Sequence, residues 1–228
     1  MSRVLPGIFW RCKMIEIGSW TREFAQRLRA EFGPRLLFMG YQGSYARGEA
    51  TPESDIDIVT ILDKADIAGL RRYRSVVGAM PQSGLACGFI CGRRELENWP
   101  RYDLLSLALD TKPVVGELAP YLPEFTDGDR REALRIGAAN LYHAVCHTYL
   151  YGDLAGALPG LLKSAFFCLR LWALVRDGGY RATRAELAGA LSGRERRILD
   201  MLAGPRPDNV GEAYSLLIDW SSEVLRQT

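Results

Sequence analysis

The sequence has little of several features that would point to particular classes of protein. Its five cysteines show no Cys-x-x-Cys spacing, and an odd number without an export signal is typical of reduced thiols in a cytoplasmic protein. An excess of charge of one sign is also missing, because 29 basic residues balance 27 acidic ones. No overall field therefore recruits nucleic acid or an acidic membrane.

Long uncharged apolar runs are missing as well. The apolar stretch at residues 4–10 is short and is broken by Pro6 and Gly7, which fits neither a signal peptide nor a membrane span. No later segment reaches membrane-spanning length without a charge, and there is no repeat or low-complexity tract. We therefore expect a cytoplasmic protein with no membrane partner, whose 228 residues suffice for one large domain or two small ones.

The most informative stretch runs over residues 40–59, GYQGSYARGEATPESDIDIV. In its first half, Gly43 allows the backbone to adopt a positive φ or to approach a ligand closely. A short helix that starts at Ser44 would direct free N–H groups and its positive dipole end at an anion, and the serine hydroxyl adds a donor. This half predicts a phosphate-binding turn that contains Gly43 and Ser44.

The second half of the stretch carries two carboxylates. Asp55 and Asp57 are two residues apart at the start of an expected strand, residues 56–62, so both point to the same face. They would repel each other unless a cation lay between them. Mg²⁺, held by carboxylates and by substrate phosphates, is the natural occupant, with Mn²⁺ as an alternative.

The combined pattern, GSxxRG at residues 43–48 followed by SDIDI at residues 54–58, resembles the signature of the DNA polymerase β-like nucleotidyltransferase superfamily. Within that superfamily, the pattern is most similar to the motifs of the minimal and kanamycin-type small-molecule members. The resemblance implies that Gly43 and Ser44 hold the triphosphate and that Asp55 and Asp57 bind the catalytic metal. The alternatives are that the first motif is an ordinary strand-to-helix turn and that the second is a solvated loop that caps a strand. Arg47 either contacts the nucleotide or braces the loop by pairing with a carboxylate.

Periodicity and turn signals predict the fold class. We expect an α+β catalytic domain with a mixed sheet over residues 19–119, after an N-terminal extension at residues 1–18. An all-helical bundle that shapes the acceptor pocket is expected over residues 126–228, with the active cleft between the two domains. Strands are expected at 36–41, 56–62, 85–91 and 112–116, and bundle helices at 127–150, 159–177, 184–191, 193–203 and 208–226.

The predicted metal site lacks one group. Superfamily members usually carry a third carboxylate, often the general base, on the strand that corresponds to residues 85–91, and LACGFIC has none. The chain's two histidines, His143 and His147, lie on the helix face opposite Leu141 and Val145. In kanamycin-type enzymes a glutamate on the corresponding helix takes the acceptor proton, and rough alignment places His143 there as a competent base. A plain surface pair and a zinc site are the alternatives.

Lys163 and Arg170 lie seven residues apart on one face of an otherwise apolar helix. Charges there are costly unless they reach solvent or meet phosphate. We therefore consider a phosphate contact for Lys163, with a salt bridge inside the bundle as the alternative.

The function predicted is Mg²⁺-dependent transfer of a nucleoside monophosphate from a nucleoside triphosphate to a hydroxyl of a small acceptor, with aminoglycoside-like acceptors suggested by analogy. A homodimer is left open. One rival is a catalytically degenerate nucleotide-binding or regulatory protein, which the missing carboxylate favours. The other is an antitoxin-like nucleotidyltransferase that modifies a protein or RNA, although balanced charge argues against nucleic acid as a partner.

Overall fold

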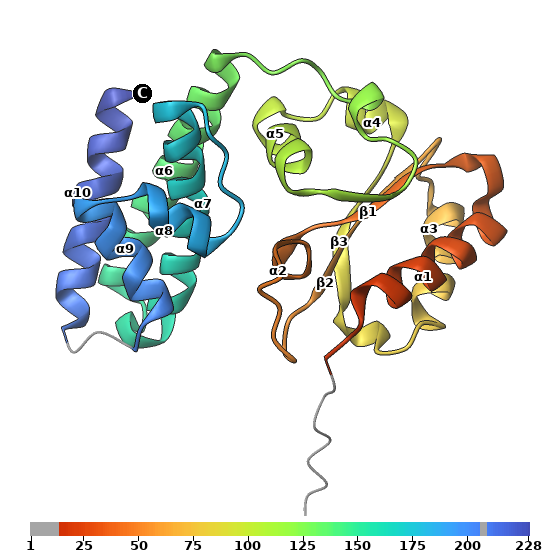
Figure 1. The fold of residues 1–228 in the computed structure, drawn as a ribbon, viewed down its shortest axis with the longest axis horizontal. Coiled ribbons are helices and arrows are strands. Elements are labelled where there is room, and N and C mark those ends of the chain that lie inside the picture. The colour runs from red at the N-terminus through yellow and green to blue at the C-terminus, as the bar shows by residue number, and fades with distance from the viewer. Residues whose placement is uncertain (1–13, 206–208) are drawn as a thin grey trace, which may run out of the picture. The chain divides into compact units, whose positions relative to one another are not determined.

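The computed structural model describes residues 14–205 and 209–228. The described chain forms two compact units. The first contains residues 14–97 and Thr111–Tyr121, and the second contains Asn98–Asp110 and the residues described from Leu122 to Thr228. Figure 1 shows the ribbon coloured by residue number. The extension predicted at residues 1–18 lies mostly outside the described residues.

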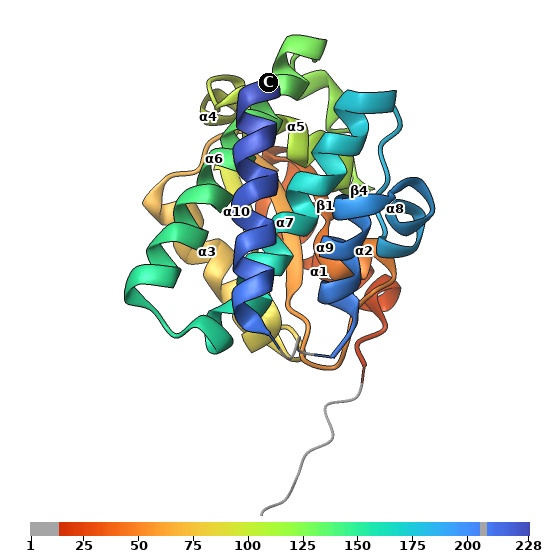
Figure 2. The same cartoon turned by 90° about the vertical axis from the view of Figure 1, so that its left-hand side faces the viewer.

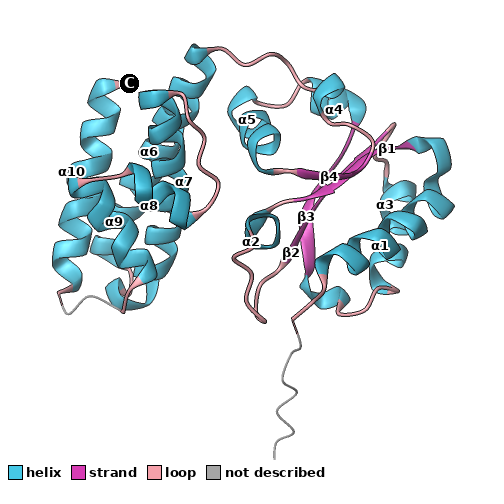
Figure 3. Cartoon of the chain, viewed as in Figure 1, coloured by secondary structure: helices cyan, strands magenta, loops and turns pink. Residues whose placement is uncertain are grey.

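The first unit is built on a four-stranded sheet in the order β3-β2-β1-β4, drawn in magenta in Figure 3. β1 (Leu36–Tyr41) pairs antiparallel with β2 (Ile56–Leu62) and with β4 (Lys112–Val115), while β2 pairs parallel with β3 (Ala86–Gly92). The mixed sheet predicted from the sequence is therefore confirmed.

Two helices, α1 (Ile17–Phe32) and α3 (Ile67–Gly78), pack against each other and cover one face of this sheet (Figure 1). The apolar residues of α1 recur at helical spacing, so they form one stripe, and each is buried: Trp20, Phe24, Leu28 and Phe32. Burying a side chain of this size stabilises the fold by roughly 1.5–3 kcal/mol. This stripe is the main attachment of α1 to the sheet.

β2 is the strand that connects the core to the site. Ile56, Ile58 and Leu62 belong to the same buried cluster as the α1 stripe. Because side chains alternate along a strand, Asp57 points to the opposite face, away from α1 and α3. The hydrophobic pattern of β2 thus fixes the direction of the carboxylate.

The second unit is all helical. Figure 2 shows α6 (Asp127–Tyr151), α7 (Leu154–Asp177), α9 (Gly193–Ala203) and α10 (Val210–Gln227) side by side. α7 packs against the other three and against α8 (Arg184–Ala190), so it is the central helix of the bundle. By length and composition alone α7 could span a membrane, since its most apolar window has a mean hydropathy of 1.5, but 56% of that window is buried inside the protein.

Two predictions about the helices differ from the structure. α5 (Arg101–Asp110), predicted inside the first domain, belongs to the second unit because it packs on α6. The second difference concerns α7, which was expected to begin at Pro159. It begins at Leu154, where the Asp153 carboxylate accepts a hydrogen bond from the Ala155 N–H at 3.1 Å. The carboxylate cap, and not the proline, therefore marks the start of this helix.

Candidate active site

The phosphate-binding turn predicted from the sequence lies where β1 ends. Gly43 begins the five-residue helix α2 (Gly43–Arg47) with a φ of +70°, in the left-handed region that favours glycine. The turn is tied to β2 because the Gln42 N–H donates to the Asp57 carbonyl at 2.8 Å. A β-carbon placed on Gly43 would lie 1.9 Å from Oδ2 of Asp57. The turn and the Asp57 carboxylate are therefore in direct contact.

Ser44 is the second residue of α2 and is half-buried. Its carbonyl accepts a hydrogen bond from the Glu49 N–H at 2.9 Å, which closes the short helix. Gln42 makes no side-chain hydrogen bond that caps the helix start, and none of the described residues bonds to the Ser44 hydroxyl. Tyr45, the next residue, is buried in the core of the unit and anchors the turn.

Asp55 and Asp57 differ in their surroundings. Asp55 is exposed in the loop before β2, whereas Asp57 is partly buried as the second residue of that strand. In the parallel pairing of β2 with β3, Asp57 lies opposite Cys87. The Cys87 thiol donates to Oδ1 of Asp57 at a sulfur-to-oxygen distance of 3.4 Å. A thiol therefore occupies the strand position next to the predicted metal ligand.

Cys87 is the residue that sequence reasoning missed. The absence of a carboxylate from residues 85–91 was evident, but the side chain that lies beside Asp57 was not. The identification needs the register of two apolar runs, Ile56 with Ala86 and Asp57 with Cys87. No local pattern fixes such a register.

The side chains at this edge of the sheet are of the type that binds a hard divalent cation, but they are too few to complete its coordination. Asp55 and Asp57 supply carboxylate oxygens, which Mg²⁺ prefers. Across the described ranges, no group of three or more histidine, cysteine, aspartate or glutamate side chains is arranged to hold a metal ion. A cation held here would take its remaining ligands from substrate phosphates and water, as the sequence-based prediction assumed.

Arg47 pairs with a carboxylate of its own loop. Its Nε donates to Oε2 of Glu49 at 3.0 Å, and the two side chains are only 11% and 16% exposed. A charge-assisted hydrogen bond of this kind holds the end of α2 against the following loop. The geometry agrees with the loop-bracing alternative for Arg47.

The remaining candidates belong to the helical unit. His143 is exposed on α6, with its ring centroid 6.0 Å from that of His147, and Lys163 is exposed on α7. Their roles in proton transfer and phosphate binding stay predictions. Arg170, by contrast, is 2% exposed and forms an ion pair with Asp110 of α5, which is the salt bridge considered for charges on this helix.

Comparison with known proteins agrees with this geometry. Residues 21–104 match the family model described as a nucleotidyltransferase domain. The matched range contains the whole signature and confirms the resemblance noted in the sequence. Fold and match together define a nucleotidyltransferase domain with a C-terminal helical part, which is the architecture of an enzyme of that superfamily. No curated protein matches the chain.

Among solved structures, the chain is similar to a spectinomycin adenyltransferase from Enterococcus faecialis, crystallised with ATP and spectinomycin. The TM-score is 0.60 at 15% sequence identity, and the alignment covers 92% of this chain and 99% of that one. Both the sheet and the helical unit therefore have counterparts in one known protein. At this level of identity the similarity demonstrates a shared fold.

Proposed function

We propose that this protein transfers a nucleoside monophosphate from a nucleoside triphosphate to a hydroxyl group of a small molecule. The closeness of Gly43 to Asp57 carries the proposal, because the predicted phosphate-binding turn and the predicted metal ligand are then neighbours. The nucleotidyltransferase match over residues 21–104 supports the reaction class. The similar adenyltransferase, crystallised with ATP and an antibiotic, supports a nucleotide and a small acceptor as the substrates.

The reaction needs little covalent help from the protein. The acceptor oxygen attacks the α-phosphorus, the bond from that phosphorus to the bridging oxygen breaks, and pyrophosphate leaves. Gly43 lets the backbone come close to the leaving phosphates, and the Ser44 hydroxyl donates to one of their oxygens. Asp55 and Asp57 would hold Mg²⁺, or Mn²⁺, which offsets phosphate charge when bound. Most of the rate enhancement would come from positioning and charge stabilisation.

The acceptor hydroxyl must lose its proton to a general base. A carboxylate at position 87 cannot serve as that base, because the residue there is Cys87. His143 is the proposed acceptor of that proton, because a neutral imidazole works as a base near neutral pH. Lys163, on the same helical unit, is proposed to contact phosphate. Mutation tests the two roles separately. His143→Ala should lower turnover, and Lys163→Ala should weaken nucleotide binding.

A second candidate function is nucleotide binding without turnover. Cys87 favours it, because a thiol supplies neither the ligand charge nor the basicity of a carboxylate near Asp57. A protein of this kind would bind Mg²⁺ with a nucleoside triphosphate and release no pyrophosphate with any acceptor. Pyrophosphate release in an acceptor screen therefore separates the two candidates.

The test is calorimetric titration with ATP, GTP, CTP and UTP, with and without Mg²⁺. The wild type is compared with an Asp55→Asn, Asp57→Asn double variant. Glu53→Gln is the matched control, since Glu53 is an exposed acid of the same loop with no partner among the described residues. We expect metal-dependent binding in the wild type and the control, and none in the double variant. Binding that survives in the double variant would refute the proposed site.

A further inference from the structure

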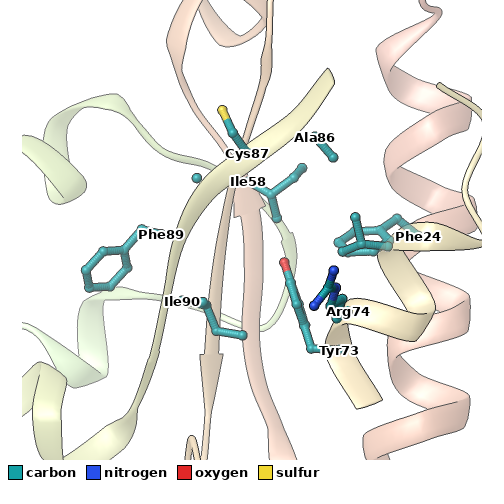
Figure 4. Close-up of a pocket in the computed structure, with 10 residues that line it drawn as sticks. Phe24, Ile58, Tyr73, Arg74, Ala86, Cys87, Phe89 and Ile90 are labelled. Carbon is teal, nitrogen blue, oxygen red and sulfur yellow. The ribbon is translucent and has the colours of Figure 1, made fainter. Parts of the chain in front are cut away.

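The first unit contains a cavity of about 260 Å³ between α3 and β3 (Figure 4). It lies on the α1 and α3 side of the sheet, since Ile58, which points to that side, lines it. The nucleotide-binding candidates Gly43, Ser44, Asp55 and Asp57 are not among its lining residues. Cys87 does line it, and the Cys87 thiol bonds to Asp57, so the cavity adjoins the candidate active site at this one residue.

Small residues on β3 leave this space open. Ala86 and Gly88 lie on the same side of the strand as Ile90, and neither has a side chain large enough to fill the space there. Gly88 has a φ of +131°, and a β-carbon built on it would lie 2.0 Å from the Ile58 carbonyl oxygen. Only glycine fits at that position. The close approach of β3 to β2 thus keeps side-chain bulk out of the cavity.

The walls of the cavity are mostly apolar and partly aromatic. Phe24, Ile58 and Val77 contribute apolar surface, and the rings of Phe24 and Tyr73 meet edge to face with centroids 5.9 Å apart. The Tyr73 hydroxyl bonds to Thr60 at 3.1 Å, and burial raises the pKa of Tyr73 to about 12, so this group stays neutral. An aromatic ligand would meet complementary surfaces here.

Arg74 gives the cavity its charge. Of the described residues that line it, Arg74 is the one that carries a charge, and no carboxylate faces it. Arg74 forms no ion pair with any described residue. Arg74 is exposed, so its guanidinium can reach a ligand that enters from solvent, and it favours bidentate pairing with a carboxylate.

We propose that this cavity binds a small aromatic carboxylate, with its ring between Phe24, Val77 and Ile90 and its carboxylate on Arg74. The volume is slightly below the range typical of sites for drug-sized ligands, roughly 300–1,000 Å³, so one or two fused rings are the appropriate size. The site is a second ligand site in the catalytic unit, and it does not depend on the proposed transferase activity.

The probe for the test is 2-naphthoate, followed by its fluorescence, with the neutral 2-naphthamide as its matched analogue. We expect the wild type to bind naphthoate, and Arg74→Gln to weaken that binding about tenfold while leaving naphthamide unaffected, since a hydrogen bond to a charged group contributes roughly this much. Arg71→Gln is the control, because Arg71 is an exposed residue of the same helix that does not line the cavity. Equal loss in both variants, or no binding by the wild type, would overturn the proposal.

Two further measurements locate the probe. Val77→Phe narrows the cavity and should abolish binding of both ligands. In the wild type, naphthoate should slow alkylation of Cys87, which is exposed and also lines the cavity; this readout remains if Val77→Phe fails to fold. The Asp55→Asn, Asp57→Asn variant should bind naphthoate as the wild type does. If naphthoate does not protect Cys87 and also binds Val77→Phe as well as it binds the wild type, the probe binds elsewhere and the proposed site is refuted.

Discussion

Gly43 lies so close to Asp57 that a side chain at position 43 would displace the carboxylate. The β-carbon of an alanine at position 43 would lie 1.9 Å from Oδ2 of Asp57, and the φ of +70° is itself unfavourable for any residue with a side chain. Backbone and carboxylate therefore occupy adjoining positions in the site. A phosphate that reaches the turn also reaches the neighbourhood of Asp57.

Gly43→Ala should consequently abolish binding of Mg²⁺-nucleotide and should lower stability by roughly 1–3 kcal/mol, because strain at the turn and displacement of Asp57 act together. Calorimetry and urea unfolding measure the two effects. Gly78→Ala is the control, since Gly78 has a negative φ and no atom within 4 Å of its added β-carbon. A Gly43→Ala variant that binds nucleotide normally would contradict the geometry.

Cys87 can be tested by restoring an acid. Cys87→Asp places a carboxylate beside Asp57, so we expect tighter binding of Mn²⁺, measured by electron paramagnetic resonance, and faster pyrophosphate release. Cys87→Ser keeps a neutral donor and should change neither quantity appreciably. If Cys87→Asp binds the metal no better than Cys87→Ser does, position 87 lies outside the metal site.

The variant Tyr45→Phe tests whether the Tyr45 hydroxyl contacts a bound nucleotide. This hydroxyl is buried and has no hydrogen-bond partner in the described residues, and such a group costs roughly 1–3 kcal/mol. Tyr45→Phe should therefore leave the free energy of unfolding unchanged or raise it, as urea titration would show, without affecting nucleotide affinity. A loss of affinity would instead assign the hydroxyl to the bound nucleotide.

Arg170 and Asp110 connect α7 with α5 inside the helical unit. The guanidinium is almost fully buried, pairs with Asp110 and stacks over Tyr180 at 4.8 Å. Arg170→Met should lower the free energy of unfolding by about 3–5 kcal/mol, because Asp110 loses its cationic partner and keeps the hydrogen bond from Tyr180. Adding Asp110→Asn should recover part of that loss. Arg135→Met, which removes an exposed ion pair with Glu132, should cost less than about 1 kcal/mol.

Asp129 predicts a dependence of stability on pH. Hydrogen bonds from Arg101 and from Thr126 hold the pKa of Asp129 well below its ordinary value of 3.8. A lowered pKa in the folded state means that the carboxylate stabilises the protein above the unfolded pKa, and that this contribution is lost as the pH falls through the folded pKa. Asp129→Asn should therefore be less stable than the wild type at neutral pH.

The gap in unfolding free energy between the wild type and Asp129→Asn should shrink below pH 3.8. Urea unfolding at several pH values measures it. Asp127→Asn, at an exposed position of the same helix, is the control for a general charge effect. A gap that is independent of pH would show that the Arg101 contact does not perturb Asp129.

The local parts of this structure were accessible from the sequence. Gly43, Ser44 and Asp57 lie within one short stretch, so turn chemistry and strand alternation suffice to predict their positions and directions, while their roles stay predictions. The match over residues 21–104 confirms the class that this stretch indicates. The stripe of α1 was equally readable, because its residues follow helical periodicity.

The parts that the sequence did not reveal depend on distant contacts. The position of Cys87 beside Asp57 depends on the register between β2 and β3. The unit to which α5 belongs depends on its packing against α6. The start of α7 was misplaced because Pro159 resembles a first-turn proline, while Asp153 provides the cap. Each of these features is decided by a partner rather than by the local pattern.

The position of α5 in the chain has a consequence for synthesis on the ribosome. All strands of the sheet have been made once the chain passes Val115, so the first unit can fold while later residues are still being added. α5 emerges earlier than α6, the helix on which it packs, so the surface of α5 that contacts α6 must wait for that helix. During that interval this surface of α5 is open to chaperones and to misassociation, and a fragment ending at residue 121 would lack its partner helix permanently.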